Sequence, residues 1–292
     1  MNIEKEINMN NRTVFKSHSD NVDSTKLALD KYYTPVSLAR ELIGLTVDKI
    51  GLQNISQFVE PSAGSGSFSN ILSTIKDTIA IDIEPDSADI IKSDYLSYFL
   101  PYKKGRCIIG NPPFGSKMLL AREFFNKSIL EGDYVAFILP ISQINNDVFL
   151  YKFDLIYSCD LGEVMFSDRA VHCCFNIYER PRSGKLNKKP TYDLPEHIVS
   201  VIDYRKGKNT PFDDRYIRVC SRGSRAGEVI DGDFMSNEIW VDIKDSPISS
   251  KIIDAVYKYN YWNEPYSTKN NTVSARLPKW RFCQYLINVI KI

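Results

Sequence analysis

A neutral amide and an aromatic ring flank two prolines in the stretch IIGNPPFGSK, residues 108–117. The Asn111 amide cannot abstract a proton as a base, but its oxygen can accept a hydrogen bond. Pro112 and Pro113 have a fixed φ and no N–H donor, and Phe114 offers a flat apolar face. The chemistry expected of this corner is therefore hydrogen bonding and stacking.

Two further groups of residues have the types expected around a bound ligand. Gly64 and Gly66 allow a tight turn close to a ligand, although Ser69 replaces the third glycine of a dinucleotide fingerprint and an ordinary turn is the alternative. Asp82 offers a carboxylate about where a ribose diol lies in a doubly wound fold. Asp94 could accept a hydrogen bond from an adenine amino group. Helix capping is the alternative role for both carboxylates.

These residues follow short apolar runs that are typical of buried strands. The runs lack polar alternation, as expected of strands buried on both faces, and cover residues 57–60, 78–83, 106–110 and 134–140. Segments with helical character lie between them, at 67–75 and 117–132, the second ending at Gly132. The alternation predicts an α/β fold with a doubly wound, Rossmann-like parallel sheet. Ligands of such sheets bind beyond the carboxyl ends of the strands, where Asn111 is expected.

Composition indicates an ordinary globular chain. At 292 residues, 43% hydrophobic and 25% charged, it is long enough for one full domain and a smaller one. The first twenty residues are polar, and no run approaches eighteen apolar residues, so we expect a cytoplasmic protein without a membrane partner. The six cysteines form no CxxC pair and there are only three histidines, so we expect free thiols and no metal site.

Charge is distributed unevenly along the chain. Residues 1–180 hold 18 Lys and Arg against 23 Asp and Glu, a balance of −5, whereas residues 181–292 hold 19 against 13, a balance of +6. The run RPRSGKLNKKP, at 180–190, marks the change. We therefore expect a polar N-terminal segment at 1–30, a main domain at 31–180 and a smaller basic region over 181–292.

The basic region mixes arginine and lysine with aromatic residues and turn formers. This mixture is densest in residues 201–227 and 267–282. Such composition suits a surface that follows phosphates, and a merely solvated face is the alternative.

Five elements of the main domain, taken in order, resemble the class I S-adenosylmethionine-dependent amino-methyltransferases. YYTP (32–35) resembles the element that grips the cofactor, FVEPSAGSGSF (58–68) resembles motif I, AIDIEP (80–85) motif II and SDYLSY (93–98) motif III. NPPF (111–114) matches the catalytic motif IV of these enzymes. The order is similar to that of the gamma group of DNA adenine-N6 methyltransferases, in which a recognition region follows the catalytic domain.

The resemblance implies S-adenosyl-L-methionine as the cofactor. The residues that it implies for cofactor binding are Tyr33, Thr34, Pro35, Glu60, Pro61, Ala63, Gly64, Gly66, Phe68, Asp82, Ile83, Asp94, Tyr95 and Asn111.

The resemblance also implies how the corner works. The Asn111 side-chain oxygen and the Pro112 carbonyl would each accept one N–H of a planar amino group, so that its nitrogen can pyramidalise. Phe114 would stack on the base, which must be flipped out of a duplex. The strand RAVHCCFNIYER (169–180) is similar to the family's motif VIII, so we expect a second stacking face from Tyr178 or, as second choice, Phe175.

The sequence therefore predicts a site-specific DNA methyltransferase acting on adenine N6. The alternatives are an RNA adenine-N6 methyltransferase, a protein glutamine methyltransferase and a non-catalytic nucleic-acid-binding regulator. The expected partner is double-stranded DNA, a separate restriction endonuclease is a further candidate, and we expect a monomer.

Overall fold

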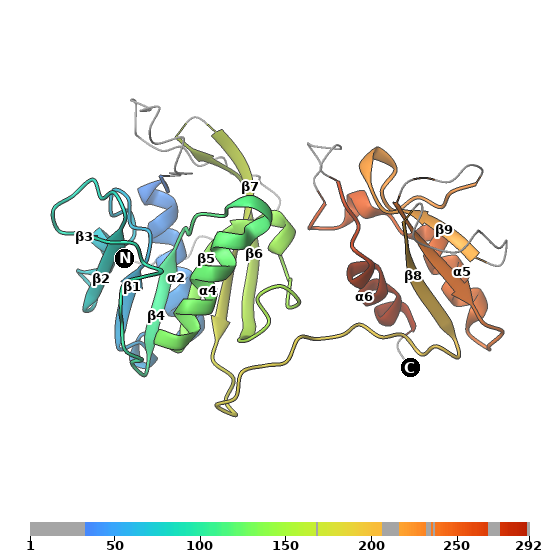
Figure 1. Ribbon diagram of the computed structural model, residues 1–292, viewed down its shortest axis with the longest axis horizontal. Coiled ribbons are helices and arrows are strands. Elements are labelled where there is room, and N and C mark those ends of the chain that lie inside the picture. The colour runs from blue at the N-terminus through green and yellow to red at the C-terminus, as the bar shows by residue number, and fades with distance from the viewer. Residues whose placement is uncertain are drawn as a thin grey trace, which may run out of the picture. The chain divides into compact units, whose positions relative to one another are not determined.

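The structure is a computed structural model that describes residues 33–167, 169–205, 216–231, 235, 237–267 and 275–290. The chain divides between Lys189 and Pro190 into two compact units, which we call the first and the second unit (Figure 1). The division follows the basic run 180–190.

The first unit is built on a sheet of seven strands. Its strands and longer helices are α2 (Val36–Ile50), β1 (Gln57–Glu60), α3 (Ser69–Leu72), β2 (Thr78–Asp82), β3 (Ile91–Lys92), β4 (Arg106–Gly110), α4 (Leu119–Glu131), β5 (Tyr134–Pro140), β6 (Asp154–Phe166) and β7 (Arg169–Glu179). The strand order is β3-β2-β1-β4-β5-β7-β6. β3, β2, β1, β4 and β5 are parallel, whereas β7 runs antiparallel to both β5 and β6. The order 3-2-1-4-5 is that of the doubly wound Rossmann sheet, so the predicted fold class is confirmed.

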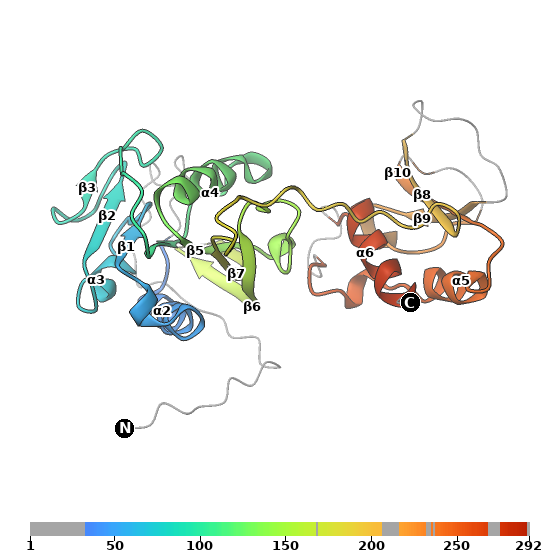
Figure 2. The same cartoon turned by 90° about the horizontal axis from the view of Figure 1, so that it is seen from below.

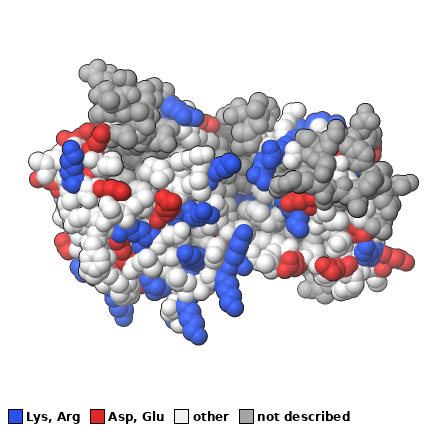
Figure 3. All heavy atoms as spheres, viewed as in Figure 1, with Lys and Arg blue, Asp and Glu red and all other residues white. Residues whose placement is uncertain are grey.

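Helices cover both faces of this sheet. Figure 2 shows α2 and α3 on one side of the strands and α4 on the other. The apolar runs therefore point side chains into two cores, which explains why they show no polar alternation. On the face seen in Figure 3, basic and acidic side chains are interspersed over the first unit.

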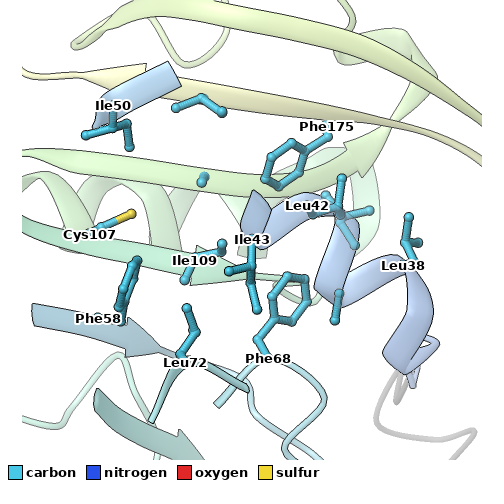
Figure 4. Close-up of a cluster of buried hydrophobic side chains, with 14 of the residues drawn as sticks. Leu38, Leu42, Ile43, Ile50, Phe58, Phe68, Leu72, Cys107, Ile109 and Phe175 are labelled. Atoms are coloured by element: carbon cyan, nitrogen blue, oxygen red, sulfur yellow. The ribbon is translucent and has the colours of Figure 1, made fainter. Parts of the chain in front are cut away.

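The larger core cluster lies between α2 and the sheet (Figure 4). Leu38 and Leu42 of α2, four residues apart, pack with Phe58, Ile109 and further strand residues that are almost fully buried. Alternate residues of β5 enter this cluster, and the residues between them face the opposite side of the sheet. The carboxyl ends of β1, β2 and β4 are thereby held at one edge.

Both predicted helices of this unit differ in length from the observed ones. The helix expected over 67–75 is regular only over Ser69–Leu72, because hydroxyls of Ser73 and Thr74 bond to backbone carbonyls three residues earlier and the chain tightens into turns. The helix expected over 117–132 begins at Leu119, since Lys117 and Met118 have left-handed φ values of 54° and 64°. It ends before Gly132 as expected, where a side chain would put Cβ 2.5 Å from the Arg106 carbonyl oxygen.

The second unit is a small α/β unit of different topology. It contains β8 (Val199–Arg205), β9 (Tyr216–Cys220), β10 (Asn237–Ile243), α5 (Ser249–Lys258) and α6 (Lys279–Ile290). The strands form an antiparallel sheet of order β8-β10-β9, with α5 packed against β10 and α6 against β8. Tyr204 and Trp240 stack at 4.3 Å between ring centroids, and Arg218 is paired with Glu238 in a buried ion pair.

The structure of the described residues bears on the expectations for membrane spans, cysteines and metal sites. None of the described helices is long and apolar enough to cross a membrane. All six cysteines are free thiols, and within the described residues no group of three or more His, Cys, Asp or Glu is arranged to hold a metal ion.

Candidate functional site

A pocket of about 310 Å³ opens at the carboxyl ends of β1, β2 and β4. Ligands of doubly wound sheets bind at this edge. The pocket is lined by Tyr33, Pro61, Ser62, Gly64, Asp82, Ile83, Asp94, Tyr95, Leu96, Asn111, Pro113, Leu120 and Phe124. Residues from all five segments that the sequence singled out thus share one cavity.

The loop after β1 is held in place by the carboxylate that ends β2. The Gly64 N–H donates to Asp82 Oδ2 at 2.7 Å, and the Glu84 N–H donates to Asp82 Oδ1 at 2.8 Å. Gly64 has φ +53°, and a side chain there would place Cβ 3.4 Å from the Tyr33 ring. The positive φ of the turn therefore favours glycine, whereas the distance to the Tyr33 ring is an ordinary van der Waals contact. Asp82 joins two loops of the pocket and caps no helix.

Asp94 stabilises a turn and also lines the pocket. Its Oδ1 accepts the Leu96 N–H at 2.9 Å, and its carbonyl accepts the Tyr98 N–H, so it initiates the turn after β3. The residue is exposed and also lines the pocket. Asp82 and Asp94 thus give the pocket two carboxylates, which suit hydroxyl or amino groups of a ligand.

Glu60 lies behind the pocket instead of lining it. The residue is 2% exposed, and its Oε2 accepts the Ser69 N–H at 2.7 Å. Burial raises the pKa of Glu60 to about 8, against the lowering effect of its hydrogen bonds with Ser69. At neutral pH this carboxyl is therefore mainly protonated, and it supports the start of α3.

Three further residues implied for motif I, Ala63, Gly66 and Phe68, also lie outside the pocket lining. Ala63 donates its N–H to the Ile81 carbonyl at 3.0 Å, and Gly66, at φ +82°, donates to the Ala63 carbonyl at 2.7 Å. Phe68 is buried in the α2 core cluster. These residues shape the loop, and the pocket wall itself is made by Pro61, Ser62 and Gly64.

Tyr33 provides the wall that faces this loop. The next two residues, Thr34 and Pro35, are buried and outside the pocket lining. The Thr34 carbonyl accepts the Ser67 hydroxyl at 2.7 Å, and Pro35 directly precedes α2. The position of Tyr33 is thus tied to the loop after β1. Tyr32, the first residue of the expected YYTP element, lies outside the described residues.

The corner after β4 presents Asn111 and Pro113 to the pocket, whereas Pro112 is buried. Phe114 is half-buried against the α2 core cluster. The Ser62 hydroxyl donates to the Asn111 backbone carbonyl at 3.0 Å. The loop after β1 is thereby linked directly to the corner.

Tyr95 lines the pocket with its ring, while its hydroxyl points away. The residue is 2% exposed, and the hydroxyl donates to Glu131 Oε2 at 2.7 Å and lies 3.0 Å from Ser128 Oγ. The ring lies 5.2 Å from that of Phe124, between centroids. Tyr95 is therefore an apolar wall, fixed from behind by α4.

Four lining residues were not among those expected. They are Ser62, Leu96, Leu120 and Phe124. Leu120 and Phe124 are four residues apart on α4, so helical periodicity directly after the NPPF corner could have placed them on the pocket side. The contribution of Ser62 depends on the distance between two loops, for which the sequence carries no signal.

The pocket lining includes none of the three aromatic residues expected to stack on a base, which are Phe114, Phe175 and Tyr178. Phe175 and Tyr178 are both 0% exposed. Phe175 lies in the α2 core cluster, and Tyr178 packs edge-on against Phe125 and accepts a hydrogen bond from Asn176 Nδ2. Strand alternation does put them on opposite faces, but helices cover both faces. Both are core residues, so neither forms a stacking face in this structure, contrary to the expectation.

Comparisons with known proteins give a partial picture. No protein-family model matches the chain, and no curated protein matches it. Similar solved structures include a protein from Pyrococcus horikoshii, provisionally described as an RNA methyltransferase, at 18% identity and a TM-score of 0.46, covering 57% of this chain and 92% of that one. Magnesium protoporphyrin IX methyltransferase from Synechocystis, with bound SAM, is similar at 9% identity and 0.39, covering 56% and 88%. A 16S rRNA methyltransferase from T. thermophilus, in complex with AdoMet and guanosine, has 13% identity and 0.35, covering 56% and 45%.

Proposed function

We propose that this protein is an S-adenosyl-L-methionine-dependent methyltransferase. Its particular reaction would be methyl transfer to the exocyclic N6 of an adenine flipped out of double-stranded DNA. The observation that carries this proposal is that Asn111 and Pro113 share one pocket with Asp82 and Asp94. The amide corner and the two carboxylates resemble, as a set, the motifs of the amino-methyltransferases.

The pocket residues fit this cofactor. Each carboxylate oxygen of Asp82 accepts one backbone N–H. These two hydrogen bonds fix the position of the carboxylate at the wall of the cavity. Asp82 would accept ribose hydroxyls and Asp94 an adenine amino group. Ile83 and Phe124 add apolar surface for the purine ring. When bound, the cofactor supplies an electrophilic methyl group on a sulfonium.

The corner would act on the nucleophile. The lone pair of an adenine amino nitrogen is delocalised into the ring, so the group is planar and weakly nucleophilic. Acceptance of its two N–H groups by the Asn111 side-chain oxygen and the Pro112 carbonyl would favour a pyramidal nitrogen with a directed lone pair. Ser62 fixes the backbone between these two acceptors through the Asn111 carbonyl.

Substrate and modified atom are tested together by labelling. The full-length protein is incubated with labelled S-adenosylmethionine and duplex DNA, structured RNA or protein, and the product is digested and identified. We expect N6-methyladenine in DNA, and its loss in Asn111→Ala. Label on RNA adenine or on glutamine amides would support one of the alternative substrates, and binding of DNA without any transfer would indicate a non-catalytic regulator.

A further inference from the structure

Two exposed arginines from distant parts of the sequence meet in the second unit. Arg222 follows β9 and Arg276 precedes α6, and the two form an antiparallel backbone bridge. The Gly223 N–H donates to the Ala275 carbonyl at 3.1 Å, and the Leu277 N–H donates to the Ser221 carbonyl at 2.9 Å. The two stretches rich in Arg and aromatic residues are thereby joined at one point.

The backbone under Arg222 is held from several sides. The Gly227 N–H donates to the Cys220 carbonyl and the Cys220 N–H donates to the Glu228 carbonyl, both at 2.8 Å, which closes the hairpin. The Trp262 indole N–H also donates to the Ser224 carbonyl at 3.2 Å. The two arginine Cα atoms are therefore fixed next to each other before any partner binds.

This arrangement is unfavourable without an anion. Like charges directly opposite on antiparallel strands destabilise the pair. Within the described part of the chain, neither Arg222 nor Arg276 forms an ion pair, and the nearby Glu228 is already bound by Arg225 at 2.9 Å. Lys279, exposed three residues beyond Arg276, adds a further positive charge. A group with closely spaced negative charges would relieve this repulsion.

We propose that the Arg222–Arg276 pair binds the phosphodiester backbone of duplex DNA. Bridged residues of antiparallel strands have Cα atoms about 4.5–5.5 Å apart, so two long side chains can reach successive phosphates of one strand. Guanidinium groups match phosphate oxygens bidentately. The identity of the partner as DNA rests on the proposed function, whereas the phosphate chemistry rests on the arginine pair itself.

The test measures binding of the full chain to a short DNA duplex as a function of salt. Each phosphate contact contributes about 0.9 to the slope of log K against log salt, so Arg222→Ala/Arg276→Ala should lower the slope by about 2. Binding should weaken by a similar factor for unrelated sequences, since phosphates carry no sequence information. The charge-retaining Arg222→Lys/Arg276→Lys variant should keep most of the slope.

The control is Lys251→Ala/Lys258→Ala on α5, which removes the same formal charge from two exposed side chains, of which Lys258 is paired with Asp254. Four outcomes would each overturn the proposal. They are an unchanged slope in the double arginine variant, an equal loss of slope in the control, a loss of binding confined to one DNA sequence, and a slope change with RNA but not with DNA. If the parent methylates DNA while the slope is unchanged, only this surface is wrong. If the slope falls as expected but no methyl group is transferred, the surface stands and the proposed activity fails.

Discussion

Replacement of Asp82 by alanine should lower both the free energy of unfolding and the affinity for the cofactor. The carboxylate accepts two backbone N–H groups, from Gly64 at 2.7 Å and Glu84 at 2.8 Å, and is 8% exposed. A hydrogen bond to a charged group contributes about 1.5–3 kcal/mol. Glu84 is exposed, so its N–H can bond to water in the variant, whereas Gly64 is half-buried. We therefore expect the free energy of unfolding to fall by about 2–4 kcal/mol.

Cofactor affinity should fall by more than a lost contact alone would cause. Removal of one charge-assisted hydrogen bond to a ligand hydroxyl corresponds to roughly 10- to 150-fold in Kd. The loop at Gly64 also loses its anchor, which adds to this loss. Asp82→Asn keeps one acceptor oxygen but turns an NH2 group toward the second N–H, so its effect should be intermediate.

Calorimetry with S-adenosylmethionine and urea unfolding measure the two effects separately. Asp89→Ala is the matched control, because it removes an exposed carboxylate from the same connection between β2 and β3. The control should leave both quantities near the parent values. Parent-like affinity and stability in Asp82→Ala would show that the carboxylate neither anchors the loop nor contacts the ligand.

Three further changes probe the same pocket. Asn111→Ala removes one acceptor for a nitrogen that becomes positive, so turnover should fall by roughly 10²–10³-fold with little change in cofactor affinity. Asn111→Asp should retain more activity than the alanine variant. Parent-like turnover in Asn111→Ala would refute the assigned role. Ser62→Ala removes the hydrogen bond to the Asn111 carbonyl, which contributes about 1 kcal/mol, and should lower kcat roughly fivefold. Ser62→Thr and the exposed-site control Ser65→Ala should leave kcat near the parent value. Glu60 has a folded-state pKa of about 8, above its unfolded value near 4.5, so its stabilising contribution is complete below pH 4.5 and is lost as the pH rises toward 8, by on the order of 1.4 kcal/mol per unit. Urea unfolding at pH 6 and pH 8 should show this decline reduced in Glu60→Gln, and an equal decline in both proteins would argue against it.

Local sequence was sufficient for four parallel strands of the seven-stranded sheet and for several residues at its edge. The strands at 57–60, 106–110 and 134–140 were predicted with their observed bounds, because an apolar run covered on both faces has no polar alternation. The ends of parallel strands meet at one edge, so Asp82 and Asn111 could be assigned to the same site before their distance was known. The recognition role of the second unit stays a prediction.

The sequence could not say which side chains are covered. Alternation places Phe175 and Tyr178 on opposite faces of β7, but only the packing of α2 and α4 on those faces makes both of them core residues. Glu60 stands beside pocket residues in the sequence, yet its hydrogen bond to Ser69 draws it behind the wall. Whether a side chain is buried depends on which other elements pack over it, and the local sequence pattern does not contain that information.

Contacts between distant segments were decided by the tertiary structure alone. The Ser62 hydroxyl reaches Asn111 because parallel pairing of β1 with β4 aligns the two loops that follow them. Arg222 and Arg276 become neighbours because backbone hydrogen bonds join the segment after β9 to the one before α6. Residue types and their spacing along the chain determined which chemistry is available in this protein. The tertiary structure determined which of those groups meet. A contact between two distant segments depends on how both of them pack, and the local sequence of either segment does not contain that information.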